Sequence, residues 1–272
     1  MEAASNSSDY SDARTLITLG LNYGGHDTAA ALMVSGQIVA ACEEERYTRK
    51  KHSREFPVNA IQSCLRSANI EIQEVDEIAL GYDPVYHVRE AYLRDALEDR
   101  EKLSSLIADR DKIAERLMSE ELIRAKTGFT GSIKFCRHHE CHLASAYYPS
   151  GFDEALVVSY DGIGEIESGL IGTGRGDCLE VVQKGPRFPH SLGLIYSAVT
   201  HFLGWKHHCD EGIVMGLATF GNPYEKMPRG DKTYIAEFRK IIQVVDDFDY
   251  RIDQAFITYH SQRDTWLSPK FF

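Results

Sequence analysis

Two stretches of the chain, about 140 residues apart, share one order of apolar runs and glycine turns. The first extends from Thr15 to Glu45: an apolar run, the turn YGGHD, a second apolar run, a Ser-Gly turn and a third run. The second, from Ala155 to Val182, contains ALVVSYDGIGE, then SGLIGTG, then CLEVV. Short apolar runs between glycine turns predict β-strands joined by hairpins. Because this meander occurs twice, the sequence predicts two subdomains of like topology.

The repeat predicts an α/β protein with duplicated RNase H-like subdomains, as in the superfamily of actin, sugar kinases and heat-shock ATPases. In that layout the first hairpin turn of each subdomain points into a shared cleft and clamps nucleotide phosphates. We expect a disordered leader at 1–14, a first subdomain at 15–150 and a second, incomplete subdomain at 151–272. Neither GxxxxGK[ST] nor a strand-anchored GxGxxG occurs, which excludes P-loop and Rossmann folds.

Composition narrows the classes of partner. The formal net charge of -11 argues against a nucleic-acid-binding surface. No apolar run approaches membrane-spanning length, and residues 1–14 lack the hydrophobic core of a signal peptide. The six cysteines show no paired CxxC spacing, which indicates reduced thiols in the cytoplasm. We therefore expect a cytoplasmic protein with small-molecule partners, no nucleic acid and no membrane.

A charged insertion at 88–126 carries apolar residues that are mostly three, four or six positions apart. This spacing predicts amphipathic helices with a break near Ser104 and Ser105. The interleaved charges are typical of a solvated helical face. The insertion is therefore expected to be structural, and it is a plausible contact surface for a homodimer.

A second charged run, EEERYTRKKHSREFP at 43–57, follows the first predicted meander. Such a run is usually a solvated loop. The alternative is an anion-binding loop in which Arg46, Arg49 and Lys51 lie beside His26. The sequence leaves both interpretations open.

A candidate metal site lies between the two predicted subdomains in the sequence. His138 and His142 are four residues apart, so on a helix they lie on one face and can reach one ion. Histidines at this spacing are often surface or packed residues, and that alternative stays open. Asp161 ends the predicted strand ALVVSY, and Gly162 and Gly164 follow it. An acidic residue before a glycine turn suits a metal or a nucleotide phosphate.

Two later segments are candidates for nucleotide binding. Ser191 and Gly193 stand at the start of a helix predicted within 189–204, where backbone amides can hold an anion. Gly216 lies in the segment DEGIVMGLATFG at 210–221, where small residues allow a nucleotide to approach closely. Helix–helix packing is the commoner reason for such glycines.

The chain resembles the NodU/CmcH O-carbamoyltransferases in three segments: GGHDTAAALMVSGQIVAACEEERYTRKKHSREFP, HHECHLASAYYPSGFDEALVVSYDGIGE and SLGLIYSAVTHFLGWKHHCDEGIVMGLATFGNP. The match keeps a consistent order and spacing from about residue 15 onward. Family members join this superfamily fold to a C-terminal YrdC-like domain, which is expected to be absent here. The resemblance implies that the YrdC-like domain makes carbamoyladenylate from carbamoyl phosphate and ATP. The first domain would then move the carbamoyl group to a hydroxyl of a small-molecule acceptor, as in antibiotic and other natural-product biosynthesis.

The resemblance also implies a set of ligands and cofactors. The metal ligands of the family fall on His138, His142 and Asp161, and a further aspartate ligand is expected beyond residue 272. Iron is the metal expected first, while zinc and manganese also suit histidine and carboxylate ligands. ATP and carbamoyladenylate, together with Mg²⁺, are the implied nucleotide cofactors.

Residues for carbamoyl transfer follow from the same resemblance. His26 would act as general base on the acceptor hydroxyl, and Lys51 would polarise the carbamoyl oxygen or hold the anion. The nucleotide-binding loops would correspond to the Gly162–Gly164 turn and the region of Gly216. Without the resemblance, His26 is equally well interpreted as a hydrogen-bonded turn residue.

Two alternative functions remain at this stage. A kinase or ATPase of the same superfamily would hold magnesium at Asp161 and release ADP, whereas transfer from an adenylate releases AMP. The pair of histidines favours a transition metal and argues against that alternative. The second alternative is a non-catalytic nucleotide-binding fragment.

Overall fold

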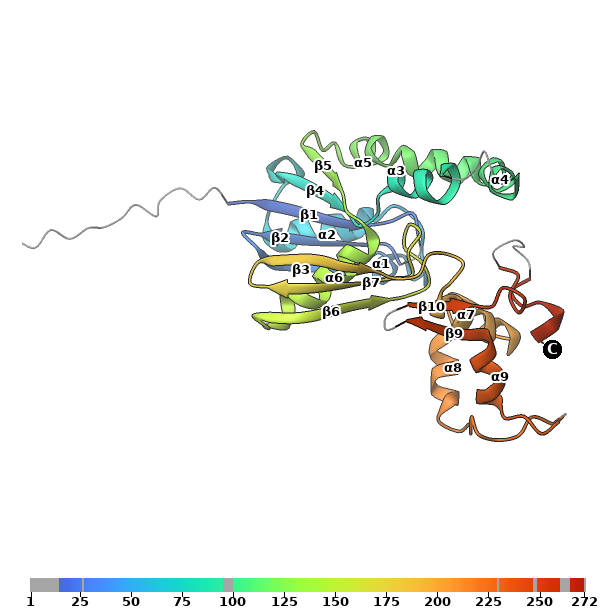
Figure 1. The fold of residues 1–272 in the computed structure, drawn as a ribbon. Coiled ribbons are helices and arrows are strands. Elements are labelled where there is room, and N and C mark those ends of the chain that lie inside the picture. The colour runs from blue at the N-terminus through green and yellow to red at the C-terminus, as the bar shows by residue number, and fades with distance from the viewer. Residues whose placement is uncertain are drawn as a thin grey trace, which may run out of the picture. The chain divides into compact units, whose positions relative to one another are not determined.

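The computed structural model describes residues 15–25, 27–94, 100–228, 230–246, 249–259 and 265–271. The chain divides into two compact units, and Figure 1 follows its elements in order. Unit 1 comprises Met1–Leu80 and Met118–Phe135, and unit 2 comprises Gly81–Leu117 and Cys136–Phe272. The predicted leader at 1–14 lies outside the described residues. The predicted subdomain boundaries and their shared cleft stay predictions.

Unit 1 contains a five-stranded mixed sheet in the order β3-β2-β1-β4-β5. β1 pairs antiparallel with β2 and parallel with β4. β3 extends the antiparallel side, and β5 extends the parallel side. The strands are β1 (Ile17–Asn22), β2 (Ala29–Val34), β3 (Gln37–Glu43), β4 (Glu77–Leu80) and β5 (Ser132–Phe135). This order and these directions are those of an RNase H-like sheet.

The core of unit 1 lies between this sheet and α2 (Val58–Ala68). Leu19 and Leu21 alternate along β1 onto the buried face, as the period of two in a strand requires. Ala60, Ile61 and Cys64 form the matching stripe on α2, with the spacing of a helix face. Burial of these two stripes holds the helix against the strands.

A buried glutamate fixes the start of α2. The residue before the helix, Pro57, makes no side-chain cap, so the first amides of α2 need another acceptor. Glu44 is only 2% exposed and supplies it: its Oε2 accepts from the Ala60 amide at 2.8 Å. Its Oε1 accepts from Asn59, through Nδ2 at 2.6 Å and the amide at 3.3 Å. The charged run at 43–57 is therefore partly buried in its structure.

Unit 2 contains the second meander as the antiparallel sheet β6-β7-β8. Its strands are β6 (Glu154–Tyr160), β7 (Gly169–Arg175) and β8 (Cys178–Lys184). In both units the middle strand shifts register against the third strand, at Leu32/Met33 in β2 and at Ile171/Gly172 in β7. The repeated meander is thus confirmed, and with it the predicted α/β class.

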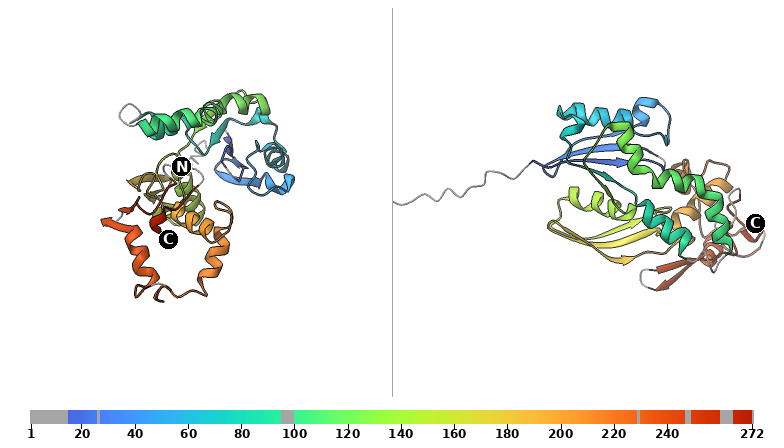
Figure 2. Two further views of the ribbon diagram at one scale, coloured as in Figure 1. Left: turned by 90° about the vertical axis from the view of Figure 1, so that its right-hand side faces the viewer. Right: turned by 90° about the horizontal axis from the view of Figure 1, so that it is seen from above.

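One helix, α6 (His138–Tyr147), lies along a face of the second sheet (Figure 2). His139, Leu143 and Tyr147 are its buried residues, four positions apart, and so form one stripe. Leu143 and Tyr147 join Val157 and Leu170 of the strands in a small hydrophobic core. This packing sets which way the other faces of α6 point.

The predicted insertion is helical. In its described residues it contains the π-helical η2 (Val88–Leu93), α4 (Arg100–Leu117) and α5 (Ser119–Thr127), and the short helix α3 (Pro84–His87) precedes it. The break predicted near Ser104 and Ser105 is wrong, because α4 continues through both residues and the interruption falls at Met118. Two exposed serines cost a helix only about 0.5 kcal/mol each, which is too little to end it.

The segments after the second sheet belong to unit 2. They contain α7 (Leu192–Phe202), α8 (Glu211–Ala218), α9 (Tyr234–Ile241), β9 (Ile242–Asp246), β10 (Asp249–Ile252) and η4 (Pro269–Phe271). The remaining short helices are α1 (Glu45–Thr48) and η1 (Ile72–Glu74) in unit 1 and η3 (Tyr148–Ser150) after α6. Ile195 of α7 packs with Ile241, Ile252 and Ile257 in a further core. None of the helices in the described ranges has the length and apolarity needed to cross a membrane.

The capping role of Glu44 leads to a first prediction. Glu44→Gln places an amide NH₂ against backbone donors, so we expect the free energy of unfolding to fall by about 1–3 kcal/mol. Glu55→Gln is the matched control, because Glu55 is an exposed partner of Lys50, and it should change stability by less than about 0.5 kcal/mol. Urea unfolding followed by circular dichroism measures both. Equal effects in the two variants would remove the capping role.

Candidate metal centre

Helix α6 presents the two candidate histidines side by side. Its sheet-facing stripe begins at His139, so His138 and His142 occupy the neighbouring stripe, one turn apart. Their Nε2 atoms lie 2.9 Å from each other. The packing of the helix on the sheet therefore brings the predicted pair together.

Asp161 follows β6 directly and completes the group. Its Oδ2 lies 2.7 Å from Nε2 of His138 and 3.2 Å from Nε2 of His142. The three ligand atoms all lie within 4.8 Å of one another, and no second group of this kind occurs among the residues that the structure describes. We call these three residues the triad.

The donor set of the triad fits a divalent metal ion. Ligand atoms about 2.0–2.2 Å from one ion lie about 3 Å apart when they are neighbours around it, and the three separations in the triad are close to this spacing. Hydrogen bonds alone satisfy this group poorly, because the two ring nitrogens face each other and both approach the same carboxylate oxygen. The other carboxylate oxygen, Oδ1 of Asp161, is buried and accepts no hydrogen bond from the described residues.

The electrostatics of the triad keep its carboxylate ionised. Burial acts to raise the pKa of Asp161, but hydrogen bonds from His138 and His142 outweigh burial. The pKa of Asp161 therefore lies well below its usual range. An ionised carboxylate beside two imidazoles is the form that binds metal. The side chains of the three residues are 28–47% exposed, so a ligand can reach them.

His139, next to the triad, has a different role. It is 2% exposed, and its Nε2 donates to the Glu167 carbonyl at 2.9 Å. Burial lowers the pKa of His139, which favours the neutral ring. The Ser159 hydroxyl then donates to Nδ1 at 2.7 Å. His139 thus fastens the first turn of α6 to β6 and to the following turn.

The start of α7 holds the turn that carries Asp161. Ser191 caps α7 by accepting from the Leu194 amide at 3.0 Å. Its hydroxyl lies 3.2 Å from the Asp161 carbonyl and 2.5 Å from the Gly162 carbonyl. A Cβ on Gly193 would lie 2.6 Å from the Asp161 carbonyl carbon, so only glycine permits this approach. Ser191 and Gly193 therefore contact the predicted glycine turn.

The other predicted glycines differ in their surroundings. A Cβ on Gly164 would lie 2.9 Å from Cδ2 of His139 and 3.2 Å from Cβ of His138, so this turn packs closely on α6. Gly162 has more space, since its Cβ would meet only Leu194, at 3.9 Å. Gly216 lies in α8 and is exposed, and a Cβ added there would meet no atom of the described residues within 4 Å. The packing role considered for Gly216 is therefore not supported by contacts.

Sequence reasoning missed two buried glutamates that follow the glycine turn. Glu165 and Glu167 are each 1% exposed. Glu165 accepts from the backbone amides of Asp83 and His138, and Glu167 pairs with Arg137 at 2.9 Å. Their signal in the sequence is the alternation of two carboxylates in EIES, directly after the turn.

The residues predicted for carbamoyl transfer belong to unit 1. His26 lies outside the described residues. Lys51 is exposed and stands beside His52, whose Nδ1 lies 2.8 Å from Oδ1 of Asp27. The sequence analysis did not identify this His52–Asp27 pair. In the sequence, Asp27 follows His26 and His52 follows Lys51, the two residues that the resemblance selected. Arg46 and Lys50 of the same run pair with Glu43 and Glu55, respectively.

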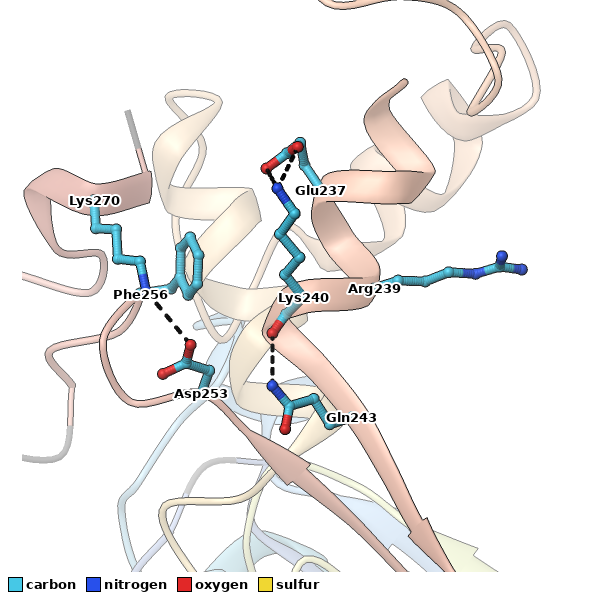
Figure 3. Close-up of a pocket in the computed structure, with 7 residues that line it drawn as sticks. All are labelled: Glu237, Arg239, Lys240, Gln243, Asp253, Phe256 and Lys270. Carbon is cyan, nitrogen blue, oxygen red and sulfur yellow. Dashed lines mark hydrogen bonds and ion pairs between the residues drawn. The ribbon is translucent and has the colours of Figure 1, made fainter. Parts of the chain in front are cut away.

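A hollow of about 580 Å³ lies elsewhere in unit 2, at α9, β9 and the segments after β10 (Figure 3). Lys240 lies 2.6 Å from Glu237, and Lys270 lies 3.5 Å from Asp253 and over the ring of Phe256. Arg239 extends away from the other lining residues. None of the predicted site residues lines this hollow, and its two lysines are engaged by its own carboxylates and ring.

Comparison with known proteins gives a consistent family match. The family model described as "Carbamoyltransferase N-terminus" matches residues 17–270. An uncharacterized protein from Synechocystis sp. is 36% identical over 252 residues, which are 89% of this chain and 39% of that protein. Nodulation protein NolNO from Sinorhizobium fredii is 34% identical over 230 residues, 84% of this chain and 31% of its own length. The chain thus spans less than half the length of these curated relatives.

Solved structures align more distantly. YeaZ from Pseudomonas aeruginosa gives a TM-score of 0.33 with 12% sequence identity. The alignment covers 61% of this chain and 66% of that one.

The contrast between two glycines gives a second prediction. Gly193→Ala forces a methyl group against the Asp161–Gly162 peptide, so we expect a loss of about 1–3 kcal/mol in unfolding free energy. Gly216→Ala enters open space within a helix and should gain about 0.5–1 kcal/mol. Thermal and urea unfolding of both variants test this pair. A neutral Gly193→Ala would show that α7 does not hold the turn closely.

Proposed function

The chain belongs to the carbamoyltransferase N-terminus family, and from this membership we propose that it supplies the carbamoyl-transferring part of a larger enzyme. The proposed reaction moves a carbamoyl group from carbamoyladenylate to a hydroxyl of a small-molecule acceptor. ATP and carbamoyl phosphate are the sources of the adenylate in this proposal. The observation that carries it is the convergence of His138, His142 and Asp161, because a site of that kind suits a cation beside a phosphate.

The triad is the proposed holder of a divalent metal ion. His138 and His142 would each give an Nε2 atom, and Asp161 would give a carboxylate oxygen. Iron is the first candidate, with zinc and manganese as alternatives, because all three accept histidine and carboxylate ligands. When bound, such an ion neutralises charge on the leaving phosphate and acts as a Lewis acid.

The turn after Asp161 is the proposed nucleotide contact. Gly162 places no side chain over this turn and has space beside it, whereas the Gly164 amide already donates to the Glu167 carbonyl at 2.9 Å, so the proposed phosphate contact centres on Gly162. Ser191 and Gly193 support the turn from α7, and in that helix the amides of Leu192 and Leu194 already donate to Tyr250 and Ser191. The first turn of α7 therefore has fewer amides for an anion than the sequence predicted. We place more of the proposed phosphate binding on the glycine turn, with Gly216 a further proposed contact.

The proposed transfer step uses residues of unit 1. His26 removes the proton from the acceptor hydroxyl, whose oxygen attacks the carbamoyl carbon. The bond from that carbon to the phosphate oxygen breaks, and AMP leaves with the electron pair. Lys51 donates a hydrogen bond to the carbamoyl oxygen as negative charge develops there.

Metal content of the purified chain is the first test of the site. We expect about one equivalent of iron, zinc or manganese by mass spectrometry, and its loss in His142→Ala. His201→Ala is a suitable control, because it removes another exposed histidine at the end of α7. Metal that persists in His142→Ala, or is absent from both proteins after reconstitution, would contradict the proposed site.

Turnover of supplied carbamoyladenylate tests the transfer step. With amino sugars as hydroxyl probes, His26→Ala should slow AMP release by about 100-fold or more, the usual scale of general base catalysis. Lys51→Gln should also slow release, whereas Lys50→Gln should not, because Lys50 is an exposed partner of Glu55. Unchanged turnover in His26→Ala would remove its role. In a separate assay with ATP in place of carbamoyladenylate, acceptor-dependent release of ADP would support a phosphoryl-transfer reaction instead.

A further inference from the structure

We propose that Glu165 is a positioning residue that sets the spacing between the histidine pair and Asp161. The inference rests on the metal site proposed above and adds to it a residue outside the three ligands. Glu165 is four positions beyond Asp161 on the same turn. It reaches back to the helix that carries both histidines.

The contacts of Glu165 are to backbone rather than to side chains. Its Oε1 accepts from the His138 amide at 3.0 Å, and Oε2 lies 3.3 Å from the same amide. Oε1 also accepts from the Asp83 amide at 2.9 Å. With 1% exposure, the carboxylate has little water to replace these partners if they move away. Glu165 thus joins three segments of unit 2 at one point.

The start of α6 requires such an acceptor. Arg137, the residue before the helix, makes no side-chain cap, so the first amides of α6 would otherwise be unsatisfied. A carboxylate at this end also interacts favourably with the partial positive charge of the helix N-terminus. Because His138 is the first residue of α6, the amide that Glu165 holds belongs to a proposed ligand.

Together with the backbone of the turn, these contacts link Asp161 and His138 in a closed loop of covalent and hydrogen bonds. From Asp161 the chain passes through the turn to Glu165, then by a hydrogen bond to His138, whose Nε2 returns to Asp161 at 2.7 Å. Loss of the Glu165 contact opens this connection and lets α6 slide along the sheet. The separation of the ligand atoms would then be set only by the apolar packing of α6.

Glu167 provides a matched comparison. It is equally buried, but its carboxylate contacts side chains: Tyr86 hydroxyl at 2.7 Å and Arg137 at 2.9 Å. The Arg137 guanidinium also lies over the Tyr86 ring, 3.8 Å from its centre. Removal of the Glu167 charge should destabilise unit 2, since it leaves the partly buried Arg137 guanidinium without its ion-pair partner. It should leave the His138 amide bonded to Glu165.

The test compares Glu165→Gln with Glu167→Gln in the 272-residue chain. In Glu165→Gln the side-chain NH₂ faces two backbone donors. We therefore expect the dissociation constant of this variant for Co²⁺ to be about 10–100-fold higher than that of wild type, the usual effect of losing a residue that supports metal ligands. Glu167→Gln should lower the melting temperature with little change in that constant. Co²⁺ absorption adds a readout of ligand geometry that a merely structural role would not alter.

Hydrogen exchange gives a second readout that requires no metal. Peptides covering the first turn of α6 should exchange faster in Glu165→Gln and at the wild-type rate in Glu167→Gln. Equal Co²⁺ affinity or equal exchange in the two variants would overturn the positioning role. If the wild-type chain binds neither Co²⁺ nor iron, the proposed metal function fails, and the exchange comparison alone decides the role of Glu165.

A shorter carboxylate keeps the test open if Glu165→Gln does not fold. Glu165→Asp retains the charge but lacks one methylene group, so it can hold only one of the two amides. We expect a folded variant whose Co²⁺ affinity and α6 exchange lie between those of wild type and Glu165→Gln. Wild-type values for both measurements would contradict the proposal.

Discussion

In each unit the position of one helix, α2 or α6, depends on a buried carboxylate that accepts backbone amides at the start of that helix. A helix leaves its first amides without internal partners, and its N-terminal end carries partial positive charge. α2 begins after Pro57 and α6 after Arg137, and neither residue supplies a side-chain cap. Glu44 and Glu165 fill this role from other segments. Because each acceptor is distant in sequence, each cap also fixes where its helix lies.

In unit 2 this cap and the sheet constrain α6 in different ways. The stripe of His139, Leu143 and Tyr147 fixes the rotation of the helix, because only that face is buried against the strands. The bond to Glu165 limits movement along the helix axis. With both fixed, His138 and His142 point to the end of β6, and their distances to Asp161 follow. The neutral, buried His139 adds no charge beside the ionised carboxylate.

Local patterns in the sequence predicted much of this arrangement. The strands of the two meanders follow from short apolar runs between glycine turns, and the histidine pair follows from the spacing of a helix face; both patterns depend on neighbouring residues alone. Asp161 was identifiable because it ends a strand before a glycine turn. Glu165 was not, since its partners Asp83 and His138 are far along the chain and donate through backbone, which leaves no side-chain pattern. The break placed at Ser104 failed because the weak helix propensity of two serines costs too little to end a helix of this length.

The residues proposed for metal binding and those proposed for carbamoyl transfer lie in different units of the chain. All three residues of the triad lie within residues 138–161, and Glu165, the proposed positioning residue, follows four residues later in the same unit. Their geometry therefore depends on α6, β6 and one turn. Lys51, in contrast, belongs to unit 1, as does the segment that contains His26. A change at Lys51 should leave metal affinity intact while it slows transfer, and a change at Glu165 should act first on metal affinity, because the two act through separate sets of contacts.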